Sequence, residues 1–160
     1  MSLIVNRAMK FKDAVVVFLA TGFYVGKIPF APGTFGTLWG LPLCFFLAGM
    51  KLPLAVVCVV LLIALAIWLA HAAEKVLKQK DPGCIVIDEI AGMVVTMIGL
   101  PFNLTTASIG YIIFRILDIA KPFPIKTLDK RVSGGAGIVI DDVVAGMFAN
   151  LLLRLILTVS

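Results

Sequence analysis

Apolar residues in this chain occur in long blocks separated by short polar segments. The longest block runs from Leu54 to Ala73 and contains no charged residue in 20 positions. As an α-helix it would be about 30 Å long, which matches the hydrocarbon core of a bilayer. The pattern therefore predicts a membrane-spanning helix in this part of the chain.

Four other apolar blocks are shorter: Phe35–Met50, Ile90–Leu104, Thr105–Leu117 and Val143–Ser160. Several have fewer than the roughly 17 residues that a span needs, so some are expected to be tilted, kinked or re-entrant. The segment Phe11–Val25 is expected to be a helix at the membrane interface rather than part of a secretory signal. We therefore predict one all-α integral membrane domain over residues 1–160, a bundle with about four to five spans plus this N-terminal helix.

The composition agrees with a lipid-facing exterior. Hydrophobic residues make up 61% of the 160 residues and charged residues only 14%, with a mean hydropathy of +1.12. An average soluble domain has about 25% charged residues, and so small a domain could not cover its surface with this few polar groups. The oligomeric state does not follow from these numbers.

Lysine and arginine indicate the orientation, because basic loops remain on the cytoplasmic side. In a five-span arrangement Lys51 is the main exception. The basic residues that fall on the common side are Arg7, Lys10, Lys12, Lys27, Lys75, Lys78, Lys80, Lys121, Lys126, Lys130 and Arg131. The net charge of +5 would then favour anionic lipid headgroups. No motif supports nucleic-acid binding.

Acidic residues interrupt the apolar blocks at three places, Asp88–Glu89, Asp118 and Asp141–Asp142. Acids beside a span are costly unless they are paired, hydrated or bound to metal, so they are candidates for function. In the five-span arrangement all of them approach the cytoplasmic surface. Their mutual repulsion would then require protons or a divalent cation, and oxygen ligands beside water suit Mg²⁺. We predict that Asp88, Glu89, Asp141 and Asp142 are the metal ligands.

Two of these acidic segments resemble each other. Residues 83–93 and 137–147 both follow the pattern G-x-[IV]-[IV]-x-D-x-[IV]-A-G-M. In a helix, Asp88 shares a face with Gly92 and Asp142 with Gly146, and a glycine lets a neighbouring backbone approach closely. The hypothesis is that two helix starts pack together and bring their carboxylates into one site. The alternative is a chance match between apolar sequences.

Basic and glycine-rich segments adjoin the acids. Arg115 and Lys121 could hold a phosphate, or Arg115 could neutralise Asp118 while Lys121 reaches the interface. Gly134 and Gly135 allow backbone amides to approach an anion, although a simple turn has the same composition. The loop from Gly26 to Thr37 could cap a helix or form a headgroup pocket; its candidate substrate-binding residues are Lys27, Thr34 and Thr37.

Several phosphatase chemistries are excluded by the sequence. His71 is the single histidine, no cysteine is followed by arginine six positions later, and neither D-x-D-x-[TV] nor G-x-x-x-x-G-K-[ST] occurs. The cysteines Cys44, Cys58 and Cys84 have apolar surroundings and no metal-type spacing, so they are expected to be structural thiols. Metal-assisted hydrolysis is the phosphatase chemistry that remains.

Four motifs in order resemble the phosphatidylglycerophosphatase A family: APGTFGT at 31–37, DEIAGM at 88–93, FRILDIAKPFPI at 114–125 and LDKRVSGGAGIVIDDVVAG at 128–146. The resemblance implies a helical, Mg²⁺-dependent lipid phosphatase of the bacterial inner membrane. Such an enzyme converts phosphatidylglycerophosphate to phosphatidylglycerol and inorganic phosphate, with its active site on the cytoplasmic side.

The same motifs imply an active site with the catalytic residues Asp88, Glu89, Arg115, Asp118, Lys121 and Asp142. They also include Asp129 and the glycine loop. Whether water or an aspartate attacks the phosphate is open at this point. Three rival hypotheses are a small ion-coupled transporter that uses intramembrane carboxylates, a structural scaffold subunit, and a metal-dependent headgroup phosphotransferase.

Overall fold

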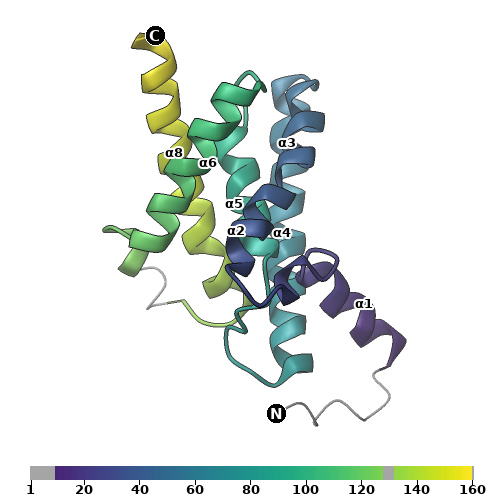
Figure 1. Cartoon of the computed structure of the whole chain (residues 1–160). Helices are drawn as coiled ribbons and strands as arrows, with labels where there is room; N and C mark the ends of the chain where they lie inside the picture. The colour runs from purple at the N-terminus through teal and green to yellow at the C-terminus, as the bar shows by residue number, and fades with distance from the viewer. Residues whose placement is uncertain (1–9, 128–131, 160) are drawn as a thin grey trace.

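All regular elements in residues 10–127 and 132–159, which the computed structural model describes, are helices (Figure 1). They are α1 (Phe11–Ala20), a 3₁₀ helix (Val25–Lys27), α2 (Pro32–Trp39), α3 (Leu41–Ala48), α4 (Leu52–Leu77), α5 (Ile87–Met97), α6 (Leu104–Ala120) and α8 (Gly135–Val159). The predicted all-α class is confirmed for these residues.

Two described helices, α4 and α8, are long and apolar enough to cross a bilayer, with 26 residues in Leu52–Leu77 and 24 in Gly135–Thr158. The outer face of α4 presents large apolar side chains, and Leu61 and Trp68 are 64% and 59% exposed. Such a surface is unfavourable in water. Together these features indicate a membrane protein.

The prediction of four to five spans is not confirmed, because the shorter apolar blocks do not form continuous long helices. The block Phe35–Met50 is divided between α2 and α3, which meet at Gly40 and Pro42. The block Ile90–Leu104 ends its helix at Met97, since Ile98 is extended and Gly99 has a positive φ of 67°. The predicted interfacial helix corresponds to α1, which stops at Ala20.

Helix α5 is the centre of the bundle. Nine of its eleven residues are buried, and it contacts α2, α3, α4, α6 and α8. It reaches α8 most closely where two glycines face each other: a Cβ on Gly146 would lie 2.5 Å from the carbonyl oxygen of Gly92. A Cβ on Gly92 would lie 2.5 Å from the Phe114 ring and 2.9 Å from the carbonyl oxygen of Asp142. Any larger residue at these two positions would therefore push the helices apart.

The far ends of α5 and α8 are joined by side chains of α8. The Asn150 amide donates hydrogen bonds to the carbonyl oxygens of Thr96 and Ile98, at 2.8 and 3.0 Å. The Arg154 guanidinium donates hydrogen bonds to the carbonyl oxygens of Ile98 and Gly99, at 3.0 and 3.3 Å. The last carbonyls of a helix have no partner within that helix, so α8 satisfies the C-terminal end of α5.

The opposite end of the bundle contains the starts of α5 and α8 and the ends of α4 and α6 (Figure 1). Helix α1 packs against α4 at this end, and Val86 donates a backbone hydrogen bond of 3.0 Å to Ala20. The candidate acidic residues that the structure describes lie on or beside these helix ends.

Candidate active site

The acidic residues of the two repeated segments meet between α5 and α8. Asp88 and Glu89 lie in the first turn of α5, and Asp142 lies in the second turn of α8. One carboxylate oxygen from each of the three residues can be chosen so that all lie within 4.8 Å of one another. The shared site expected from the sequence repeat is therefore present in the structure.

The glycine contact explains how the acids come so close. Asp88 and Gly92 are four residues apart on α5, as are Asp142 and Gly146 on α8, so each acid lies one turn before the glycine crossing. Because Gly92 and Gly146 have no side chain, the helix backbones meet there. The carboxylates on the preceding turns are then held at a separation that one cation can bridge.

Burial makes this group of acids electrostatically unfavourable without a cation. Asp142 is 3% exposed, whereas Asp88 and Glu89 are half-buried because they face a cavity. Burial raises the pKa of Asp88 well above its ordinary value of 3.8, and the charges of Glu89 and Asp142 raise it further. Burial also raises the pKa of Glu89. A nearby divalent cation would favour the charged carboxylates and reverse this effect.

A cavity of about 160 Å³ lies at this point, and its walls are strongly acidic. Among the described residues, six carboxylates and one ammonium group line it: Asp81, Asp88, Glu89, Asp118, Asp141, Asp142 and Lys121. Asp81 was not among the residues expected from the sequence. It belongs to the loop before α5, and the signal was an acid two residues before the first repeated segment.

Lys121 contributes a cation to the cavity wall. It follows the last residue of α6 with a positive φ of 41°, and its ammonium group lies 2.5 Å from Oδ2 of Asp141. Asp141 is 3% exposed, so this ion pair neutralises one of the buried acids. Of the four predicted metal ligands, three form the close group, and Asp141 lies beside them in contact with Lys121.

Arg115 lies behind the cavity and holds Asp118. Its Nη1 is 2.5 Å from Oδ2 of Asp118 and 3.5 Å from the Thr37 hydroxyl. That hydroxyl donates a hydrogen bond of 2.8 Å to the carbonyl oxygen of Gly33. A Cβ on Gly33 would collide with Oε1 of Glu89 and lie 3.2 Å from the Arg115 guanidinium. The APGTFGT segment therefore supports the site from α2 by leaving space for Glu89 and Arg115.

The other predicted substrate-binding residues do not line the cavity. The Lys27 ammonium lies 4.3 Å above the Tyr24 ring, and the Thr34 carbonyl accepts a 3.3 Å hydrogen bond from Tyr111. Gly134 and Gly135 pack against α4, where a Cβ on Gly134 would lie 3.3 Å from Nδ1 of His71. Their roles in binding substrate remain predictions. Asp129 lies outside the described residues.

The carboxylates fit a hard divalent cation. Among the described residues, Oδ1 of Asp88, Oε2 of Glu89 and Oδ2 of Asp142 are buried without a hydrogen-bond partner. Unpaired buried oxygens of this kind are costly, and Mg²⁺ prefers one or two carboxylates together with water and phosphate oxygens. Asp88, Glu89 and Asp142 are the described residues best placed to hold such an ion.

Known proteins similar to this chain point to lipid phosphate chemistry. The family model described as Phosphatidylglycerophosphatase A matches residues 18–157. Phosphatidylglycerophosphatase A of Escherichia coli (strain K12) is 41% identical over 132 residues, which cover 82% of this chain and 77% of that protein. The protein of the same name in Haemophilus influenzae is 34% identical over 82% of each chain.

A third relative carries a different name. The "Putative phosphatidylinositol-3-phosphatase" of Bacteroides thetaiotaomicron is 33% identical over 154 residues, which cover 91% of this chain and 95% of that protein. No solved structure gives a significant match. The named relatives share a phosphorylated lipid as substrate and differ in its headgroup.

Proposed function

Because the chain belongs to the phosphatidylglycerophosphatase A family, we propose that it hydrolyses phosphatidylglycerophosphate to phosphatidylglycerol and inorganic phosphate. The observation that carries the proposal is the acidic cavity between α5 and α8, which lies within the matched residues. The cavity supports this part of the molecule as the place where a phosphate monoester is hydrolysed. A phospholipid is accordingly the substrate class, and the enzyme is a phosphoric monoester hydrolase rather than a transporter.

The charge of the cavity supports a requirement for Mg²⁺. A phosphate monoester is an anion, and six carboxylates against one ammonium group would repel it. A divalent cation on Asp88, Glu89 and Asp142 would offset part of this negative charge and present a positive centre to the phosphate oxygens. Bound there, Mg²⁺ supplies Lewis-acid chemistry to the phosphoryl group and to the attacking water.

The residues around the cation position the reactants. The reaction forms a bond from the water oxygen to phosphorus and breaks the bond from phosphorus to the ester oxygen, which receives a proton. The Lys121 ammonium faces the cavity and stabilises charge on the phosphoryl oxygens. Asp118 presents its carboxylate to the same cavity and can accept a hydrogen bond from the water. Arg115 acts through Asp118 by fixing its orientation.

The surface of the protein supports an active site at the cytoplasmic face of the bacterial inner membrane. Exposed lysines gather at the site end of the bundle: Lys10, Lys12, Lys27, Lys75, Lys78, Lys80 and Lys126. Exposed Phe23 and Trp39, whose rings lie 6.1 Å apart, are near the same end. Basic residues favour the cytoplasmic side, and aromatic residues favour the interface. In this orientation α4 and α8 cross the bilayer as spans of a multi-pass protein, the acyl chains stay in the bilayer, and the headgroup enters the cavity.

The test is phosphate release by purified protein in detergent with Mg²⁺, measured on phosphatidylglycerophosphate, phosphatidylinositol 3-phosphate and phosphatidic acid. Each substrate is presented at the same fraction of the micelle surface. The proposal expects the highest kcat/KM on phosphatidylglycerophosphate. Preference for the inositol lipid would reassign the substrate, and no phosphate release from any of the three would overturn the proposal.

A further inference from the structure

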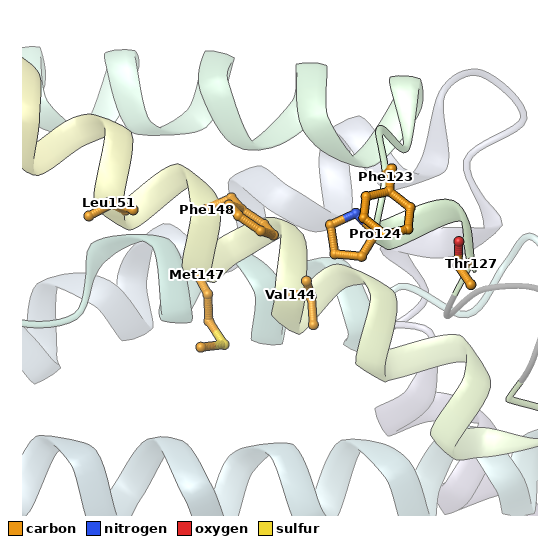
Figure 2. Close-up of a pocket in the computed structure, with 7 residues that line it drawn as sticks. All are labelled: Phe123, Pro124, Thr127, Val144, Met147, Phe148 and Leu151. Atoms are coloured by element: carbon orange, nitrogen blue, oxygen red, sulfur yellow. The ribbon is translucent and has the colours of Figure 1, made fainter.

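A large apolar groove lies beside the acidic cavity and has no role in the chemistry described so far. Its volume is about 830 Å³. The chain just after α6 forms one wall, with Phe123, Pro124 and Thr127. The outer face of α8 forms the other wall (Figure 2). Of the residues that the structure describes, none that lines the groove is charged.

The groove and the acidic cavity share one boundary, the ion pair between Lys121 and Asp141. Phe123 follows Lys121 by two residues, and Val144 follows Asp141 by three. On α8, Asp141, Val144 and Phe148 have helical spacing i, i+3 and i+7, so they share a face. Both walls of the groove therefore begin at the ion pair that also lines the cavity.

The direction of the groove matches that of a lipid. From Val144 to Leu151 it follows α8 away from the acids for about 10 Å. Because α8 is one of the two helices long and apolar enough to cross a bilayer, this direction leads toward the hydrocarbon core. A phospholipid with its phosphate in the cavity has its apolar part leaving along this path.

We propose that the groove binds one acyl chain of the phospholipid substrate and thereby positions its phosphate in the cavity. This inference rests on the proposed function, since it concerns the same substrate. The surroundings of an acyl chain are equally apolar in the bilayer and in the groove, so burial alone gives little affinity. The groove contributes orientation, because an acyl chain held in place limits the positions of the headgroup.

The test compares two phosphatidylglycerophosphates in the same detergent, one with oleoyl chains and one with hexanoyl chains too short to fill the groove. In Met147→Trp, the indole occupies the groove. The ratio of kcat/KM for the long ester to that for the short ester is expected to fall about tenfold, because the long substrate loses its orientation. The matched control is Leu61→Trp on the exposed face of α4, for which the ratio should stay at the wild-type value.

A second measurement does not depend on turnover. A phosphonate analogue that carries a diazirine midway along one acyl chain should label residues 144–151 of the wild-type protein, and excess long-chain substrate should reduce the labelling. Equal labelling of α4 and α8, or equal loss of activity on both esters in Met147→Trp, would overturn the acyl-chain assignment. Phosphate release from the short ester by the wild type tests the hydrolase activity separately, and its absence would instead contradict the proposed function.

Discussion

Gly146 of α8 faces the carbonyl oxygen of Gly92 on α5, so closely that a Cβ atom would lie 2.5 Å from that oxygen. This contact places Asp88 and Asp142, each one turn earlier, around a common point. The geometry of the candidate metal ligands is thus set by two residues that have no polar side chain.

Gly146→Ala should separate α5 from α8 and lower activity. Overpacking of this kind costs about 1–3 kcal/mol of stability, and misplacement of the carboxylates should lower kcat/KM by roughly a hundredfold. Phosphate release and thermal unfolding in detergent measure the two effects. Gly49→Ala is the matched control, because its nearest neighbour would lie 3.7 Å away. Equal activity in both variants would show that the close approach is not needed.

Asp88→Asn and Asp142→Asn should each lower phosphate release by more than about a hundredfold, since both remove charge from the candidate metal site. Both should remain folded, because asparagine has nearly the same shape and relieves the repulsion between buried acids. Asp13→Asn on α1, away from the cavity, is the control. Near-normal turnover of either site variant would remove that residue from the mechanism.

Removal of divalent metal should abolish phosphate release, and added Mg²⁺ should restore it. The physical reason is the repulsion between the substrate anion and the acidic cavity walls. Activity is measured in EDTA and again after titration with Mg²⁺. Full turnover in the chelator would contradict the metal assignment.

The metal-free protein should become less stable as the pH rises. The pKa values of Asp88 and Glu89 are raised in the folded state, so the folded protein binds more protons than the unfolded chain above about pH 4. The free energy of unfolding of the metal-free protein is therefore highest in acid and decreases as the pH rises through the raised pKa values. With EDTA, Tm should be higher at about pH 5 than at about pH 8, and Mg²⁺ should reduce the difference.

Asp88→Asn provides the control for this pH dependence, since it removes one of the titrating groups. Its metal-free Tm should change less between the two pH values than that of the wild type. A metal-free wild type that gains stability toward alkaline pH would contradict the raised pKa values.

Lys121→Met should lower kcat by about a hundredfold, since it removes the one cation that the described residues place in the cavity wall and leaves the buried Asp141 without this partner. Lys121→Arg keeps the charge and should recover part of the activity. Lys126→Met, at an exposed position five residues later, is the control. If Lys121→Met and Lys126→Met had equal turnover, Lys121 would have no role in stabilising the transferred phosphate.

The acidic site could be predicted from the sequence because its geometry depends on helix periodicity. Asp88 with Gly92, and Asp142 with Gly146, are four residues apart, and that spacing alone places each acid beside a glycine. The position of Arg115 beside Asp118 follows from a spacing of three residues in the same way. The convergence of separate helices was inferred from topology and agrees with the structure.

Loop residues were harder to interpret, because composition does not show which way a loop folds. Gly134 and Gly135 match an anion-binding loop in composition, but in the structure they allow the start of α8 to pack closely against α4 at His71. Gly33 carries no chemistry of its own, yet its missing side chain leaves space for Glu89. The predicted four to five spans are not confirmed, since apolar composition does not reveal the breaks at Gly40 and Gly99.

The hydrogen bonds from Asn150 and Arg154 have a mechanical consequence. These bonds join α5 to α8 at one end, and the contact between Gly92 and Gly146 lies in the middle. At the other end, the like charges of Asp88 and Asp142 repel each other. A divalent cation bound between Asp88 and Asp142 would offset this repulsion and hold that end of the helix pair together. Opening without metal should therefore start at the acid-bearing ends of α5 and α8, where amide hydrogen exchange would accelerate first, while the opposite end of α5 stays protected.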